Sequence, residues 1–147
     1  MSRILRQLKK HDKDICIYGL GKMGACMFWS FRECGMQEDY YADKDPNKQN
    51  LNIDGIKCIS FDDLLKKDRS IILIVALYDY KSVVKSFVTM GFKNVYNYKE
   101  VLHAIRKEPK RNFKQIRSYE EAYKVKQVVK EWLCRGVKLN INDLLEG

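Results

Sequence analysis

The sequence lacks the cysteine and histidine patterns that define several functional classes. It has no C-x-x-C pair, and its cysteines are odd in number and lie mostly in apolar stretches. They are Cys16, Cys26, Cys34, Cys58 and Cys134. This usage favours small buried side chains in a reducing compartment over a disulfide framework or a zinc site. The two histidines, His11 and His103, have no partners at metal-ligand or catalytic-triad spacing.

Long hydrophobic runs are also missing. The longest apolar run covers residues 71–77, whereas a helix that spans a bilayer needs about 20 apolar residues. Residues 1–14 are basic and amphipathic without an apolar centre, so they do not match a secretory signal peptide. We therefore expect no transmembrane segment and a cytoplasmic location.

The length and the charge limit the architecture and the partners. At 147 residues the chain has the size of one domain, with no room for the separate substrate domain of classical dehydrogenases. It is either a stand-alone module or a piece of a larger protein. The net charge of +9 favours anionic partners such as nucleotides and phosphorylated sugars. The densest basic stretch, residues 106–117, lacks interleaved aromatic residues, so a solvated linker is favoured over a nucleic-acid site.

The most informative pattern is an apolar strand over residues 14–18, followed by G-x-G-x-x-G and the start of a helix. The first glycine allows a tight turn, the second lets a pyrophosphate approach the backbone, and the third lets the helix pack closely on the strand. The helix N-terminus then offers N–H donors to a phosphate. The candidate phosphate-binding residues are Gly19, Leu20, Gly21, Lys22, Met23 and Gly24. The alternative is a purely structural glycine turn.

Two further segments complete the candidate site. Asp43 follows the glycine pattern at the distance expected for an acid that accepts hydrogen bonds from ribose hydroxyls, with an acid that faces water at the strand end as the alternative. Lys44 stands beside it and is a candidate phosphate contact, with solvation as the alternative. Ala76, Leu77 and Tyr78 end a central strand and are expected to line the crevice opposite the glycine loop, or simply to pack there.

Strand and helix patterns alternate along the chain up to about residue 107. Continuous apolar residues over 70–77 indicate a central strand buried on both faces, and residues 56–59 indicate a short edge strand. We predict a Rossmann-like α/β three-layer sandwich, with a mainly parallel sheet of about five strands, in a domain of residues 1–107.

Residues 108–147 are predicted to form a basic connector and a C-terminal amphipathic helix. The helix is expected over residues 119–133, after a capping box that begins at Ser118. Its apolar stripe is Ala122, Val125, Val129, Trp132 and Leu133. Two alternatives remain open for this stripe. It packs back on the domain, or it forms a homodimer or docks a companion domain or enzyme.

Three short motifs carry a resemblance to a known family: Asp43-Lys44-Asp45-Pro46 with Lys48, Asp54-Gly55-Ile56, and a short helix start at residues 60–65. Together with the glycine loop, they resemble the Rossmann-like modules of bacterial surface-polysaccharide biosynthesis, such as the N-terminal domain of sugar-nucleotide acyltransferases. In those enzymes the module holds a UDP-sugar, and catalysis belongs to a separate β-helix with hexapeptide repeats. This sequence has no such repeats, so the resemblance does not imply acyl transfer.

The resemblance implies a nucleotide or nucleotide-sugar binding module in cell-envelope polysaccharide synthesis. The alternative is the NAD(H)-binding domain of an oxidoreductase or of a sugar-nucleotide dehydratase- or epimerase-like enzyme, because both ligand types carry a ribose and a pyrophosphate. No general base, nucleophile or metal cluster is evident beside the glycine loop. We therefore favour a binding module over a self-sufficient enzyme, with no catalytic residue assigned.

Overall fold

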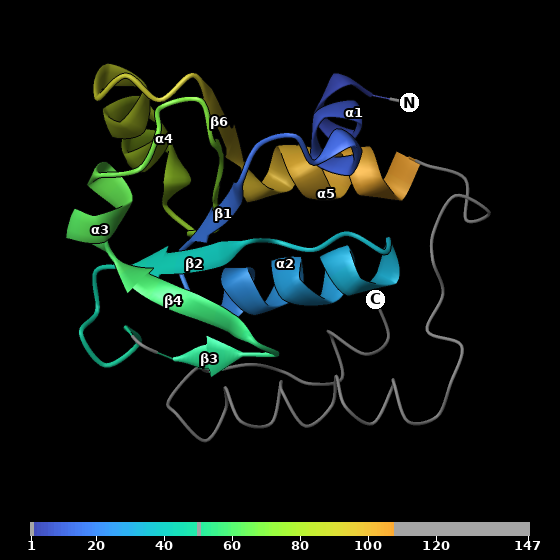
Figure 1. Cartoon of the computed structure of the whole chain (residues 1–147). Coiled ribbons are helices and arrows are strands. Elements are labelled where there is room, and N and C mark those ends of the chain that lie inside the picture. The colour runs from blue at the N-terminus through green and yellow to red at the C-terminus, as the bar shows by residue number, and fades with distance from the viewer. Residues whose placement is uncertain (1, 50, 108–147) are drawn as a thin grey trace.

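The computed structural model describes residues 2–49 and 51–107 (Figure 1). Its helices are α1 (Arg3–Lys10), α2 (Lys22–Glu33), α3 (Phe61–Leu65), α4 (Tyr80–Thr89) and α5 (Tyr98–Lys107). Its strands are β1 (Ile15–Tyr18), β2 (Tyr40–Asp43), β3 (Asn52–Ile53), β4 (Ile56–Ser60), β5 (Ile72–Val75) and β6 (Asn94–Asn97). The predicted C-terminal helix and its stripe lie outside the described residues.

The strands form one six-stranded sheet in the order β3-β4-β2-β1-β5-β6. The strands β4, β2, β1, β5 and β6 are parallel, as predicted, and β3 pairs antiparallel with β4. The prediction that residues 56–59 form the edge strand is wrong. The chain turns back at Asp54 and Gly55, which both have positive φ angles, so the preceding residues form a short outer strand β3.

Helices cover both faces of the sheet and give the α/β fold its layers. The central strands β1 and β5 are fully buried. Side chains at alternating positions, such as Ile15 and Ile17, pack with α1, α2 and α5. The neighbouring positions Cys16 and Tyr18 pack with α3 and α4 on the other face. Burial on both faces explains why these strands are apolar at every position.

The connection from α2 to β2 is held by a buried ion-pair network. The Arg32 guanidinium lies 2.8 Å from the carboxylate of Glu38, whose side chain is buried, and 3.2 Å from the carboxylate of Asp54. The hydroxyl of Tyr41 donates to the second carboxylate oxygen of Glu38 at 2.8 Å. This network ties the β3–β4 turn to the C-terminal end of α2. It therefore fixes the edge of the sheet beside β2.

No helix in the described part of the chain is long and apolar enough to cross a membrane. This agrees with the short apolar runs of the sequence.

We expect the domain to lose stability in alkaline solution. Burial raises the pKa of the Cys58 thiol from 9.0 to about 12, and burial, with the nearby Asp43 carboxylate, raises the pKa of the Tyr18 phenol from 10.0 to about 12. In the unfolded chain the thiol ionises above about pH 9 and the phenol above about pH 10, whereas both stay neutral in the folded state up to about pH 12. Each group should therefore lower the free energy of unfolding by about 1.4 kcal/mol per pH unit within its own window.

Urea denaturation at pH 8, 9, 10 and 11 measures this effect. The free energy of unfolding should be nearly constant up to about pH 9 and then fall with rising pH. Cys58→Ser should reduce the slope between pH 9 and 10, because the hydroxyl that replaces the thiol does not titrate there. A free energy of unfolding that stays constant up to pH 11 would contradict the burial of these groups.

Candidate functional site

The candidate site lies where the chain changes direction across the sheet. Counted along the chain, the parallel strands are arranged as third, second, first, fourth and fifth, so β1 lies between β2 and β5. The chain leaves β1 towards β2 and leaves β5 towards β6, in opposite directions. In open α/β sheets, a crevice opens at such a point, outside the carboxyl ends of the two central strands. Here that point lies at the residues that follow Tyr18 and Val75, which are register partners.

The first glycine of the loop packs directly against the segment that follows β5. Gly19 has a φ of +105°, which L-residues rarely adopt. A Cβ at this position would lie 2.8 Å from the carbonyl oxygen of Ala76 and 2.6 Å from the Cδ2 of Leu77. The structure therefore brings the glycine loop together with two of the residues predicted to stand opposite it.

The third glycine sets the distance between helix and turn. A Cβ on Gly24 would lie 2.2 Å from the carbonyl oxygen of Gly19. Only a residue without a side chain lets α2 begin this close to the end of β1. The role predicted for the third glycine is therefore seen in the contact geometry.

The second glycine is open, in contrast to the other two. Gly21 has an ordinary φ of −115° and is the N-cap residue of α2. The nearest atom to a Cβ built there is the Nζ of Lys48, at 3.9 Å. The first-turn N–H groups of a helix have no acceptor within the helix, and Gly21 makes no side-chain cap. The loop thus presents an accessible backbone at the positive end of α2.

Asp43 fastens this loop to the end of β2. One carboxylate oxygen accepts a hydrogen bond from the backbone N–H of Leu20 at 2.7 Å, and the other accepts from the N–H of Asp45 at 2.8 Å. Its predicted contact with ribose stays a prediction. The two bonds occupy half of the four lone-pair positions of a carboxylate, so acceptor capacity remains.

The turn after β2 places a lysine that the sequence analysis did not assign to the site. Asp45 accepts hydrogen bonds from the N–H of Asn47 through its carboxylate and from the N–H of Lys48 through its carbonyl, both at 3.0 Å. This compact turn brings the Lys48 ammonium beside Gly21. The D-x-D-P-x-K motif of residues 43–48 contains this lysine, but the motif does not show that the lysine side chain extends to Gly21.

The remaining predicted residues have different surroundings. Lys22 is exposed at the start of α2. The ammonium of Lys44 lies 4.6 Å from the centre of the Phe61 ring, a side chain of α3. Ala76 is buried, and the side chain of Tyr78 is 88% exposed at the turn before α4. Of these, Tyr78 is the large side chain with the most exposed surface.

A groove of about 760 Å³ extends from this edge of the sheet along α2 and α5. Met23, in the first turn of α2, lines the end of the groove at the glycine loop. The start of α4 contributes Tyr80, and the end of β6 contributes Asn97. The groove and the glycine loop therefore share a residue and the same edge of the sheet.

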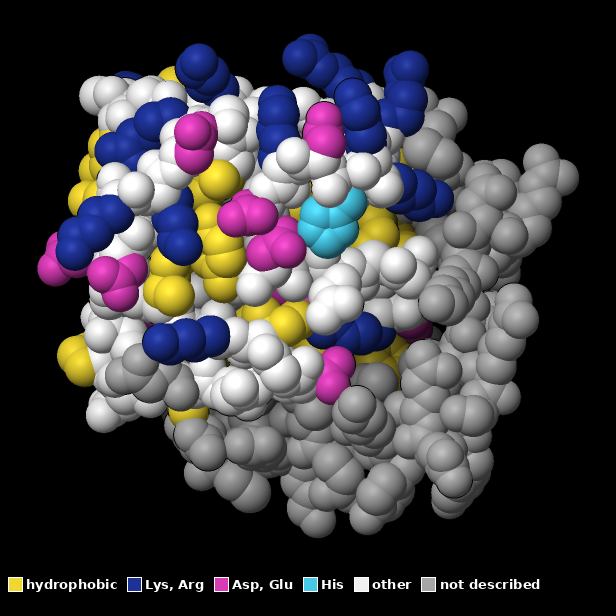
Figure 2. Space-filling view, in the orientation of Figure 1, with side chains coloured by type: hydrophobic (Ala, Val, Ile, Leu, Met, Phe, Trp, Pro, Cys, Tyr) yellow, Lys and Arg dark blue, Asp and Glu magenta, His cyan; other side chains and the backbone are white. Residues whose placement is uncertain are grey.

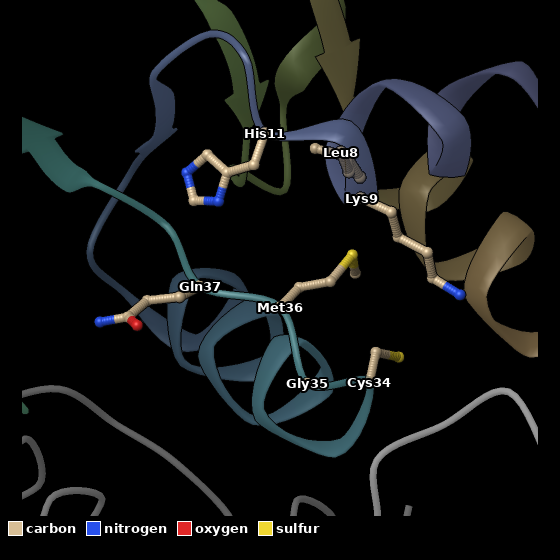
Figure 3. Close-up of a pocket in the computed structure, with 7 residues that line it drawn as sticks. All are labelled: Leu8, Lys9, His11, Cys34, Gly35, Met36 and Gln37. Carbon is tan, nitrogen blue, oxygen red and sulfur yellow. The ribbon is translucent and has the colours of Figure 1, made fainter.

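A second hollow, of about 430 Å³, lies at the opposite edge, before β1 and β2 (Figure 3). Its histidine, His11, lies 3.0 Å from the Asp39 carboxylate, which also accepts the N–H of Ile15 at 2.6 Å. In Figure 3 the sulfur of Cys34 is turned away from the His11 ring. The hollow therefore holds a histidine paired with a carboxylate that also binds the backbone of β1.

The basic charge of the described residues is distributed widely. Figure 2 shows Lys and Arg side chains across the upper part of one face, with acidic side chains between them. This view displays no continuous basic patch of the kind that binds a nucleic-acid backbone. Within residues 2–49 and 51–107, no group of three or more His, Cys, Asp and Glu side chains is arranged to hold a metal ion.

No known protein-family model matches this chain, and no curated protein is significantly similar to it.

Proposed function

We propose that this chain binds a nucleotide or a nucleotide-sugar diphosphate at the carboxyl edge of its sheet. The observation that carries the proposal is the open Gly21 at the uncapped N-terminus of α2, with the Lys48 ammonium beside it. Backbone N–H groups, a helix dipole and a lysine are the donors that a pyrophosphate requires. In this proposal the α/β fold acts as a Rossmann-like nucleotide-binding domain.

The strand order supports a ligand that crosses the sheet edge. The diphosphate lies at the glycine loop, the ribose lies towards Asp43 at the end of β2, and the crevice continues to Ala76, Leu77 and Tyr78 after β5. The acid at the end of β2 favours free ribose hydroxyls over a 2′-phosphate. The main rival within the same site is NAD(H).

The biological role proposed for the module is cell-envelope polysaccharide synthesis. It rests on the resemblance of the Asp43–Lys48 turn and the Asp54-Gly55-Ile56 segment to modules of that pathway. The chain acts as a binding module in this proposal, and its catalytic partner is a separate domain or protein. Turnover of a sugar nucleotide by the purified chain alone would contradict this role.

Calorimetric titration with UDP-sugars, NAD⁺ and NADP⁺ tests the ligand. We expect UDP-sugars to bind, with NADP⁺ the weakest because its 2′-phosphate would face the Asp43 carboxylate. Preferential binding of NAD⁺ would instead favour the alternative function, an NAD(H)-binding domain of an oxidoreductase. If none of them binds at millimolar concentration, the glycine loop is a purely structural turn and the proposed function is wrong.

Gly21→Ala is the sharpest variant for this site. The added methyl group meets nothing closer than the Lys48 Nζ at 3.9 Å, and φ is −115°, so the fold should be retained. The same methyl group stands where the diphosphate must approach the backbone. We expect the affinity for the nucleotide to fall by roughly 100-fold, or about 3 kcal/mol, while the urea midpoint stays within error of the parent protein.

The matched control for Gly21→Ala is Ser82→Ala, an exposed substitution on α4 outside the groove and the loop. It should change neither the affinity nor the urea midpoint. Unchanged nucleotide affinity in Gly21→Ala would exclude the loop as the phosphate site.

A further inference from the structure

The groove between α2 and α5 has a composition suited to one part of a larger ligand. Its floor combines Met23 and Cys26 from α2 with Leu102 from α5, and all three side chains are half-buried. Tyr80 and Tyr98 pack edge to face above this floor, with ring centres 5.9 Å apart and an interplanar angle of 89°. Such a surface accommodates a flat or apolar ring face and offers few partners to buried polar groups.

The rim of the groove carries positive charge at the end near the glycine loop. Lys99 is exposed in the first turn of α5, and its ammonium lies 5.7 Å from the centre of the Tyr80 ring. Glu100 is engaged in a capping box, in which it accepts the N–H of Asn97 and donates its own N–H to the Asn97 side chain. Lys99 is therefore the cation at the end of the groove near the glycine loop, and Arg106, in the last turn of α5, also lines the groove.

The position of the groove relates it to the phosphate site. Met23 belongs both to the glycine loop and to the groove lining, and Tyr80 begins the helix that follows the crevice residues. Figure 1 shows α2 and α5 running side by side, with both helices beginning at the same edge of the sheet. A group joined to a phosphate at the start of α2 would thus enter the groove without crossing the sheet.

We propose that this groove is a second subsite, which takes a ring joined to the distal phosphate of a nucleoside diphosphate. The inference rests on the proposed function and deepens it, because it states where the second part of the ligand lies. The ring packs its apolar face on Met23, Cys26 and Leu102. Its acceptor groups lie towards Lys99. A nucleoside diphosphate alone fills only the glycine-loop half of the site.

The test compares two-part ligands with their nucleoside diphosphates: UDP-glucose with UDP, and NAD⁺ with ADP. In the parent protein, one of the two-part ligands should bind more tightly than its nucleoside diphosphate. Leu102→Trp fills the groove from α5 and should weaken the two-part ligand about tenfold, leaving the nucleoside diphosphate unchanged. Val88→Trp, on the exposed side of α4, is the control for added bulk and should affect neither.

A charge reversal provides a second variant that leaves the apolar floor of the groove unchanged. Lys99→Glu should weaken the two-part ligand several-fold more than the nucleoside diphosphate. Lys81→Glu is its matched control, because Lys81 is the second residue of α4 as Lys99 is the second residue of α5, is also exposed, and does not line the groove. The two variants carry the same charge change at equivalent helix positions.

The outcomes separate this inference from the proposed function. If UDP or ADP binds but neither two-part ligand binds more tightly than its nucleoside diphosphate, the groove is not a subsite and the glycine-loop site stands. The same conclusion follows if Leu102→Trp and Lys99→Glu weaken both members of a pair equally. If neither nucleoside diphosphate nor two-part ligand binds, the proposed function fails and the subsite fails with it.

Discussion

Gly24→Ala is expected to lower the free energy of unfolding by at least about 2 kcal/mol. The reason is steric, because a Cβ at this position would lie 2.2 Å from the carbonyl oxygen of Gly19. The atom in the way belongs to the backbone. Gly19 cannot easily move aside, because its own N–H donates to the Ala42 carbonyl at 2.8 Å. Helix α2 must therefore move away from β1. This expected loss is opposite in sign to the effect of helix propensity, which favours alanine over glycine by about 1 kcal/mol inside a helix.

Urea denaturation followed by far-UV circular dichroism measures this change. Gly21→Ala is the internal control, since it adds the same methyl group three residues earlier, where the space is open. Its free energy of unfolding should change by less than about 0.5 kcal/mol. Equal stability of the two variants would show that α2 does not begin as close to the Gly19 carbonyl as the structure places it.

Asp43→Ala is expected to lower the free energy of unfolding by about 2 kcal/mol. The carboxylate accepts one N–H from the glycine loop, that of Leu20, and one from the following turn, that of Asp45. Leu20 is buried, so its N–H would lose a charged acceptor in a place that water reaches poorly. Asp43→Asn should cost less, because its amide retains one acceptor oxygen and can keep one of the two bonds.

The control for Asp43→Ala is Asp45→Ala in the same turn. Asp45 accepts the N–H of Asn47 in an exposed hydrogen bond, which water can replace, so the loss should be under about 1 kcal/mol. Hydrogen exchange at the Leu20 amide adds a local readout, and it should accelerate in Asp43→Ala and not in Asp45→Ala. Unchanged Leu20 exchange in Asp43→Ala would show that the carboxylate does not hold the loop.

The elements of the α/β core were predictable because their signals are local. An apolar run without interruption, as in β5, indicates burial on both faces whatever its neighbours are. Ser60 accepts the N–H of Asp63 and starts α3, as its spacing predicted. The roles of Gly19 and Gly24 were also predictable, because a tight turn from strand into helix leaves no room for a side chain.

The outer strand β3 and the order of the strands could not be predicted, because both depend on which strands pair with each other. Residues 52–53 are too few to give a strand pattern, and they are extended because Asn52 and Ile53 pair with Lys57 and Ile56. The prediction of a mainly parallel sheet is confirmed, and within it β1 pairs parallel with β5, although the two strands are far apart in the sequence. Alternation of strands and helices favours parallel pairing, but it does not state which strand becomes the outermost one.

By itself, the sequence determined the α/β fold class, the glycine loop and the acid at the end of β2, since each depends on residues close in the chain. Only the tertiary structure decided what the side chains around the loop contact. In the structure the Lys44 ammonium lies over the Phe61 ring and the Lys48 ammonium lies beside Gly21. Met23 and Leu102 line the same groove. The physical reason is that a flexible side chain's partner depends on which elements pack together, and packing brings together residues that are distant in the sequence.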